Sequence, residues 1–167
     1  MSFEPLGKVA YSEGAFEGWD KPLFAIAAQF ENNDLSGATN LTDLNTTILG
    51  GDLVYKYKRL FATLEYYRRE RTPETGSKFR SDGFFAEATY LVSSRKNWEV
   101  GARYGQYDPT DRIGANLRKE VRGVVSYYYA RHVAKIQADF GRTENQAGNG
   151  GQGTRNKELR IQTQIVF

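Results

Sequence analysis

The chain alternates apolar and polar residues over eight segments of about ten residues each. Helical periodicity is nearly absent, and a period of two is typical of β-strands that present two different faces. The predicted strands cover residues 22–32, 48–58, 60–70, 83–92, 97–107, 119–131, 133–142 and 157–167. Strands of soluble proteins usually have about five to six residues, whereas a strand that crosses a bilayer at a tilt needs about nine to eleven. The lengths therefore favour a sheet that crosses a membrane.

The connections between these segments alternate between long and short along the chain. The long ones are polar and comprise residues 33–47, 71–82, 108–118 and 143–156. The short ones comprise Arg59, residues 93–96 and the turn at His132. In an antiparallel meander alternate connections lie at opposite ends of the sheet, so one end carries every long loop, as is typical of transmembrane barrels. The pattern predicts an all-β fold, an antiparallel up-and-down transmembrane β-barrel of about eight meander strands.

One face of the predicted sheet has no charge, although 26% of the residues in the chain are charged. Phe24, Val100 and Ile161 lie on this face. An Arg or Lys at the midplane of a bilayer costs about 2–4 kcal/mol, so a face toward lipid must lack such residues. The face also has tyrosines near the strand ends, where their hydroxyls can meet lipid headgroups. These are Tyr57, Tyr66, Tyr90, Tyr104, Tyr127 and Tyr129. We therefore expect this face to point outward into hydrocarbon.

The opposite face has the charged residues, and we expect it to point toward the barrel interior. The predicted interior charges are Lys56, Lys58, Arg69, Arg103, Arg122, Lys135, Arg160, Glu65, Glu87, Glu99 and Asp139. Asp52 and Glu120 share this face, so basic and acidic residues nearly balance. A mainly positive interior would indicate selectivity for anions, whereas balanced charges are also expected if cross-strand ion pairs fill the interior. The residues alone leave both interpretations open.

Composition excludes several classes of site. The chain has no Cys and a single His, which excludes disulfides, thiolate metal sites and cysteine nucleophiles. A net charge of +3 does not by itself indicate nucleic-acid binding. We therefore expect no catalytic residue, no cofactor or metal site, no enzyme activity and no nucleic-acid partner.

Two motifs that suggest other chemistry are better explained by the strand pattern. Residues 148–153 match the dinucleotide fingerprint G-x-G-x-x-G, but a strand rather than a helix follows, so a loop is predicted. Glu65, Glu87 and Glu99 share a face and could form a cluster for acid–base chemistry. Because Arg103 lies on the same face, ion pairing is the simpler interpretation.

The chain shows one strand-rich unit and a less regular beginning. Residues 1–21 are predicted to be an irregular N-terminal segment, and residues 22–167 an eight-stranded barrel or barrel segment. The first residues lack the basic and apolar regions of a signal peptide. We therefore expect a mature or partial sequence.

Several strands resemble those of the phosphate-selective porins O and P. The similarity lies in residues 83–88 (GFFAEA), 97–104 (NWEVGARY) and 158–167 (ELRIQTQIVF), and residues 18–26 are compatible with the entry to such a strand. The final strand ends at Ile165 and Phe167, which resembles the C-terminal signal that the assembly machinery of the bacterial outer membrane recognises. The resemblance implies a homotrimeric outer-membrane channel for small solutes, often anions such as phosphate.

Members of that family have sixteen strands, so the eight strands here would match the C-terminal half of such a barrel. Eight strands alone enclose an interior filled by side chains. We therefore expect a porin segment that passes small solutes. A first alternative is a small non-conducting outer-membrane barrel that serves as an anchor or adhesin. A second is a soluble lipocalin-like barrel that binds a ligand with its apolar face inside.

Outer-membrane lipid is the partner that the uncharged face predicts. Lipopolysaccharide phosphates could meet basic residues in and near the long loops. These are Lys78, Arg80, Arg112, Arg118, Arg155 and Lys157. The same residues would equally serve as solvated loop charges.

Overall fold

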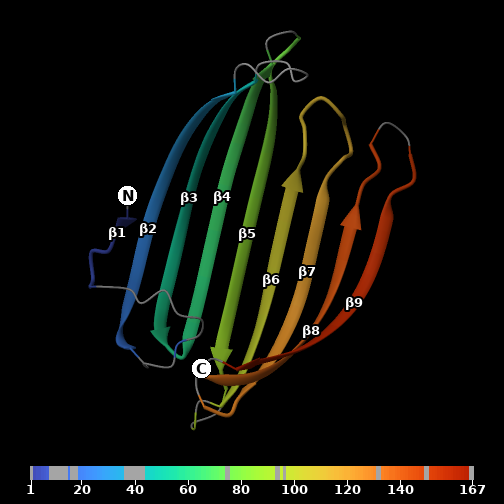
Figure 1. The fold of residues 1–167 in the computed structure, drawn as a ribbon. Coiled ribbons are helices and arrows are strands. Elements are labelled where there is room, and N and C mark those ends of the chain that lie inside the picture. Colours follow the sequence, from blue (N-terminus) through green and yellow to red (C-terminus); the bar gives the residue numbers. More distant parts are fainter. Residues whose placement is uncertain are drawn as a thin grey trace.

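The protein folds into one curved antiparallel β-sheet (Figure 1). The computed structural model describes residues 2–7, 15, 19–35, 44–73, 76–92, 95, 97–130, 133–148 and 151–165. Each long strand pairs with the next along the chain, which confirms the predicted all-β meander. No helix within these ranges is both long and apolar enough to span a bilayer.

Eight long strands make up the sheet, and each overlaps one of the predicted segments. They are β2 (Trp19–Leu35), β3 (Leu44–Lys58), β4 (Leu60–Pro73), β5 (Phe79–Leu91), β6 (Trp98–Asp108), β7 (Arg118–Tyr128), β8 (Ala134–Asn145) and β9 (Thr154–Ile165). The predicted bounds extend by one to three residues beyond β5, β6, β7, β8 and β9. A two-residue strand, β1 (Ser2–Phe3), pairs with β2 at the opposite edge from β9. Strand β2 begins at Trp19, so both it and β1 include residues of the segment that was expected to be irregular.

Several strands extend further into the predicted loops than the alternation indicated. Pairing continues to Leu35 opposite Leu44 and to Leu44 opposite Pro73, because polar strand residues can still form ladder hydrogen bonds. Residues 74–78 are all that remain between β4 and β5, fewer than the residues 92–97 between β5 and β6. The strict alternation of long and short connections was therefore wrong, since it counted the ends of hairpins as loops.

The sheet curves but remains open within the described residues. Only Ser2 and Phe3 pair with the outer edge of β2, and no strand there pairs with the outer edge of β9. These edge strands have 17 and 12 residues. A long edge strand with unpaired N–H and C=O groups is a template for pairing with another strand.

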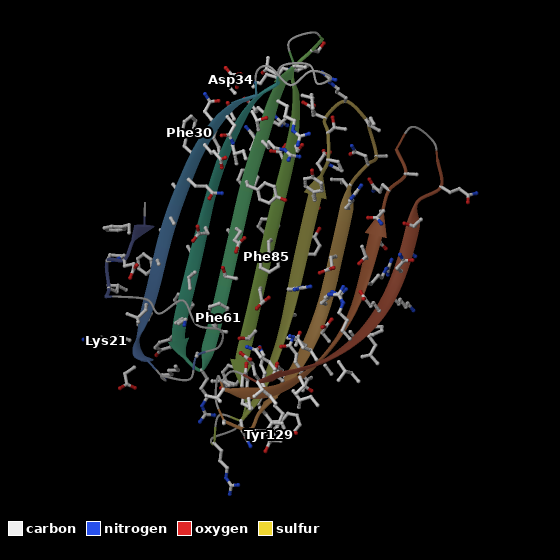
Figure 2. All side chains as sticks on the ribbon, viewed as in Figure 1. Lys21, Phe30, Asp34, Phe61, Phe85 and Tyr129 are labelled. Atoms are coloured by element: carbon white, nitrogen blue, oxygen red, sulfur yellow. The ribbon has the colours of Figure 1, made fainter. Side chains whose placement is uncertain are left out.

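The two faces of the sheet differ in the side chains that they shield from solvent. Ile161 is 70% exposed and Phe140 58%, whereas Lys56 is 0% and Arg122 3% exposed. Side chains project from both faces of a single layer (Figure 2). A single layer shields side chains mainly where its curvature brings them together, so the charged face is the concave inner face and the apolar face is the outer one.

Part of the inner face is apolar, near the turn that joins β3 and β4. Leu23, Ala25 and Val54 are buried together there, and Phe61 packs against them. Ala15, from the segment that precedes β2, is fully buried in an adjoining cluster with Leu91 and Tyr128. The N-terminal segment therefore contributes at least this residue to the interior.

Candidate functional site on the charged inner face

The strand register places ten of the eleven predicted interior charges on the inner face. They are Lys56 on β3, Glu65 and Arg69 on β4, Glu87 on β5, Glu99 and Arg103 on β6, Arg122 on β7, Lys135 and Asp139 on β8, and Arg160 on β9. The eleventh, Lys58, is exposed at the end of β3, where its ammonium lies over the ring of the outer-face residue Tyr57. A residue and its directly paired partner on the next strand share a face. The face assignment therefore follows from the backbone pairing alone.

Arg122 is the centre of a cluster of charges on this face. Its Nη1 donates to Asp139 Oδ1 at 2.6 Å, and its Nη2 donates to Glu158 Oε2 at 2.6 Å. Its Nε lies 3.2 Å from Glu120 Oε1. Three carboxylates from three neighbouring strands thus surround one guanidinium that is almost fully buried.

Gly141 explains how Arg122 reaches across β8 to β9. Gly141 is directly paired with both Arg122 and Glu158, so the three residues form one row across the sheet. A Cβ at Gly141 would lie 2.4 Å from Arg122 Cγ. The missing side chain lets the arginine lie flat against the wall instead of projecting into the interior.

Two further arginines extend the cluster along the sheet. Arg103 donates from Nε and Nη2 to Glu120 Oε1 at 3.1 and 2.8 Å. Arg160 donates from Nε to Glu158 Oε1 at 2.9 Å and from Nη2 to Glu158 Oε2 at 2.7 Å. Arg122 shares both carboxylates, so positive and negative groups alternate from β6 to β9. With Asp139 included, the cluster has three arginines and three carboxylates and is electrically balanced.

Beside this cluster lies a polar cavity of about 160 Å³. Its walls include Glu87, Glu99, Thr89 and Lys135. The Tyr128 hydroxyl donates to Glu99 Oε2. The other carboxylate oxygen, Glu99 Oε1, and Thr89 Oγ1 are buried with no hydrogen-bond partner in the described protein. Buried polar atoms normally have a partner, so this cavity suits water or a small polar solute that both donates and accepts hydrogen bonds.

The remaining predicted residues lie apart from the cluster. Arg69 Nη2 lies 3.3 Å from the Tyr107 hydroxyl. Lys58 lies over the Tyr57 ring at the turn end, and Lys56 lies over Phe61. Glu65 is paired with Asp52 across β3 and β4.

Of the two residues in the predicted C-terminal signal, only Ile165 can be placed. It lies at the end of β9 and is 58% exposed on the outer face. Phe167 lies outside the described residues, as does His132.

Glu158 belongs to the site but was not among the residues predicted from the sequence. Glu158 lies within the predicted final strand, and its parity places it on the inner face beside Arg160. Its pairing with Gly141, and through Gly141 with Arg122, depends on the strand register, which alternation alone does not determine. The sequence indicates only that Glu158 shares the charged face of the final strand with Arg160.

The outer face has an apolar band with aromatic side chains at both ends. Trp98 and Tyr127 pack with ring centroids 4.8 Å apart at the turn end, and Tyr127 packs edge-on against Tyr129 at the same distance. Phe84 and Tyr104 lie 6.3 Å apart at the loop end. On β5, Tyr90 lies six positions after Phe84, which corresponds to roughly 20 Å along the strand.

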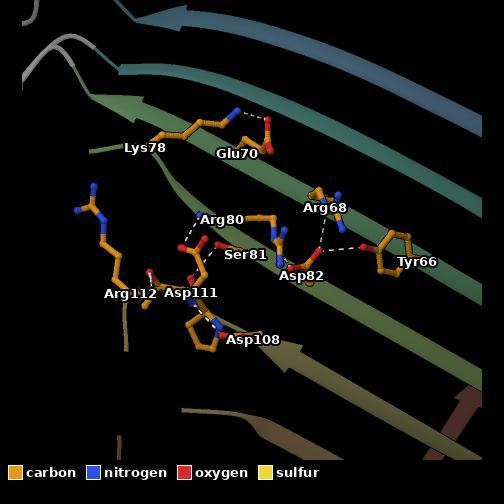
Figure 3. Close-up of polar contacts among 12 residues, drawn as sticks. Tyr66, Arg68, Glu70, Lys78, Arg80, Ser81, Asp82, Asp108, Asp111 and Arg112 are labelled. Carbon is orange, nitrogen blue, oxygen red and sulfur yellow. Dashed lines mark hydrogen bonds and ion pairs between the residues drawn. The ribbon is translucent and has the colours of Figure 1, made fainter. Parts of the chain in front are cut away.

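Above the loop-end aromatics the outer face becomes charged, in a belt that we call the collar (Figure 3). The Tyr66 hydroxyl donates to Asp82 Oδ1 at 2.8 Å. Asp82 also accepts from Arg68 Nε at 3.0 Å and from Arg80 Nε at 2.8 Å. Tyr66 therefore joins the apolar band, where its ring lies, to the polar belt that its hydroxyl contacts.

The loop between β6 and β7 folds back onto the beginning of β5. Asp111 Oδ1 accepts a hydrogen bond from the Arg80 backbone N at 2.9 Å, and the Ser81 hydroxyl donates to the Pro109 carbonyl at 2.7 Å. Asp108 Oδ1 accepts from the Thr110 backbone N at 3.1 Å. The Asp111 carboxylate thus fastens the loop to β5, and the Asp108 carboxylate stabilises the turn that follows β6.

No family model, curated protein or solved structure matches the chain.

Proposed function

We propose that the chain forms the wall of a porin-type β-barrel channel of the bacterial outer membrane. One observation carries the proposal: charged side chains are buried on the concave face, while large apolar side chains are exposed on the convex face. In water this arrangement would expose a continuous apolar surface, and such surfaces mark contact with a partner or a membrane. In a bilayer the apolar band would face hydrocarbon and the charges would line an aqueous interior.

The dimensions of the outer face support the same proposal. The apolar band of transmembrane barrels is about 25 Å tall and has aromatic girdles at both interfaces. The band here has aromatic rows at both ends and a charged collar beyond one of them. A lipocalin-like barrel would instead need Phe140 and Ile161 inside.

The open edges support a wall that is completed by further strands. Eight strands alone would close around an interior filled by side chains. The outer edges of β2 and β9 both offer backbone groups for pairing, and the two strands run in opposite directions. An even number of additional strands can therefore join them with antiparallel pairing throughout.

We further propose that the solutes are small and polar, with weak charge preference along β6–β9. The resemblance to phosphate-selective porins implies a preference for anions. However, Arg103, Arg122 and Arg160 each contact carboxylates, and a balanced wall gives little net field to select by charge.

Bilayer recordings of the refolded full chain test the proposal. We expect heat-modifiable gel mobility, detergent-dependent β circular dichroism and, where a second copy of the chain supplies the strands that close the wall, stepwise conductance with similar permeability for K⁺ and Cl⁻. A chain that inserts into bilayers without passing current would instead support the non-conducting anchor or adhesin. A monomer that stays folded in plain buffer would overturn both membrane assignments.

A further inference from the structure

A groove on the outer face runs between β7 and β8 at the loop end of the apolar band. It has a volume of about 460 Å³, within the range of about 300–1,000 Å³ that is usual for ligand sites. Its apolar walls are formed by Tyr104, Val121 and Phe140. Gly123 leaves the floor open, since a Cβ there would meet only the Gly101 carbonyl oxygen, at 4.0 Å.

The polar end of this groove is strongly basic. Lys119 and Arg142 line it, together with Glu144. Arg142 and Arg155 both contact Glu144, the latter at 2.9 Å. Lys157 is directly paired with Arg142 across β8 and β9. Like charges at directly paired positions are destabilising, so four cations around one carboxylate form a site that an anion would stabilise.

The collar continues from β4 and β5 to this end of the groove, and the excess of positive charge is larger beside the groove. On β4 and β5 the collar cations have carboxylate partners: Asp82 binds Arg68 and Arg80, and Glu70 binds Lys78 at 2.6 Å. Among the described residues beside the groove, Glu144 is the carboxylate that contacts Arg142 and Arg155. The combination of an apolar channel and an unbalanced basic end matches a molecule that has a hydrocarbon chain and an anionic headgroup.

We infer that this groove binds a membrane lipid whose phosphate headgroup carries a net negative charge. One acyl chain lies along Val121, Gly123 and Phe140, and the phosphate lies among Lys119, Arg142 and Lys157. This inference rests on the proposed membrane orientation of the outer face. It goes beyond that proposal because it names one site and one class of lipid, whereas a uniform apolar band would contact all lipids alike.

The test uses the full chain refolded in detergent micelles, with native mass spectrometry to count bound lipid. Four probes separate the parts of the ligand: dipalmitoyl phosphatidate, dipalmitoyl glycerol, dipalmitoyl phosphatidylcholine and inorganic phosphate. We expect one phosphatidate per chain and at least tenfold weaker binding of the other three. Equal binding of phosphatidylcholine or of inorganic phosphate would overturn the inference, because one half of the site would then contribute nothing.

Two variants locate the site. Gly123→Leu fills the groove, and Arg142→Gln with Lys157→Gln removes two cations. Since each basic residue near an anionic lipid contributes about a factor of five, the double variant should bind phosphatidate about 25-fold more weakly. The matched control, Lys78→Gln with Arg112→Gln, removes the same charge elsewhere at the loop end and should bind like the unaltered chain. Equal losses in the control, or unaltered binding by Gly123→Leu, would contradict the site.

A second measurement does not depend on variants that fold. Phosphatidate with a diazirine in its acyl chain should label Val121, Gly123 and Phe140 of the unaltered chain on irradiation, and labelling spread evenly over the band would overturn the inference. Conductance of the same preparation is recorded separately. A chain that binds the lipid but passes no current would reject the channel and leave the lipid site standing.

Discussion

Arg122 lies across Gly141, and this contact allows its guanidinium to reach Glu158 on the second strand along, at 2.6 Å. The result is an arginine that links β7 to β9 while it lies flat on the inner wall. A similar arrangement occurs where the Tyr67 ring lies over Gly83, whose Cβ would be 2.3 Å from the ring. Glycines on this face therefore keep bulky side chains against the wall and leave room in the interior.

Gly141→Ala should destabilise the fold, because the added methyl group overlaps the stem of Arg122. Overpacking of this kind costs about 1–3 kcal/mol in the free energy of unfolding, measured by urea titration in micelles. Gly105→Ala is the matched control on the same face, since its Cβ would be no closer than 3.9 Å to any atom. Equal effects of the two substitutions would contradict the close contact between Arg122 and Gly141.

Arg122→Gln should lower the free energy of unfolding by about 3 kcal/mol, because removing one partner of a buried ion pair leaves charges uncompensated. The comparison is Arg160→Gln, whose side chain is 48% exposed. An exposed pair contributes less than about 1 kcal/mol. A larger loss for Arg160→Gln than for Arg122→Gln in the same titration would show that Arg122 is not the centre of the cluster.

Removing a cation from this cluster and removing a carboxylate from it should shift the charge selectivity of the channel in opposite directions. Arg122→Gln leaves the cluster with an excess of one negative charge, so the reversal potential in a KCl gradient should move toward cation preference. Glu120→Gln leaves one excess positive charge and should move it toward anion preference. Shifts of the same sign in both variants would show that these side chains do not face the permeation path.

The approximate strand positions were predictable because apolar and polar residues alternate wherever the two faces of a strand have different surroundings. This alternation placed Val100 and Ile161 on one face and Arg122 and Lys135 on the other without any knowledge of register. The charge cluster was not predictable to the same degree. Its geometry requires Arg122, Gly141 and Glu158 to be in one row, and a shift of two residues would preserve both faces and lose the row.

The alternation of apolar and polar residues could not predict the lengths of the loops or whether the sheet closes into a barrel. Hairpins continue through polar residues such as Thr46 and Thr72, which form ladder hydrogen bonds without an apolar signal. Whether β2 meets β9 depends on the curvature of the whole sheet and on the strands beside its edges. The alternation of apolar and polar residues in the eight segments carries no information about the curvature or about the strands beside the edges.

Asp82→Asn should weaken the collar modestly, because Arg68, Arg80 and Tyr66 all contact this carboxylate. All four groups are partly exposed, so the loss should be about 0.5–1 kcal/mol in the free energy of unfolding in micelles. Glu70→Gln, which affects only the Lys78 pair at the same end, provides the comparison and should cost less. A larger loss for Glu70→Gln would contradict the central position of Asp82.

Val124 and Val125 test the orientation of the sheet most directly, because they are identical side chains on opposite faces of β7. The chain has no Cys, so Val124→Cys and Val125→Cys can each carry a single bimane label after refolding into lipid vesicles. A brominated acyl chain should quench the fluorescence of the label at position 125 strongly, and iodide in the water should quench the label at position 124. Strong lipid quenching at position 124, with iodide quenching at position 125, would contradict an apolar face that meets hydrocarbon and a charged face that lines the interior.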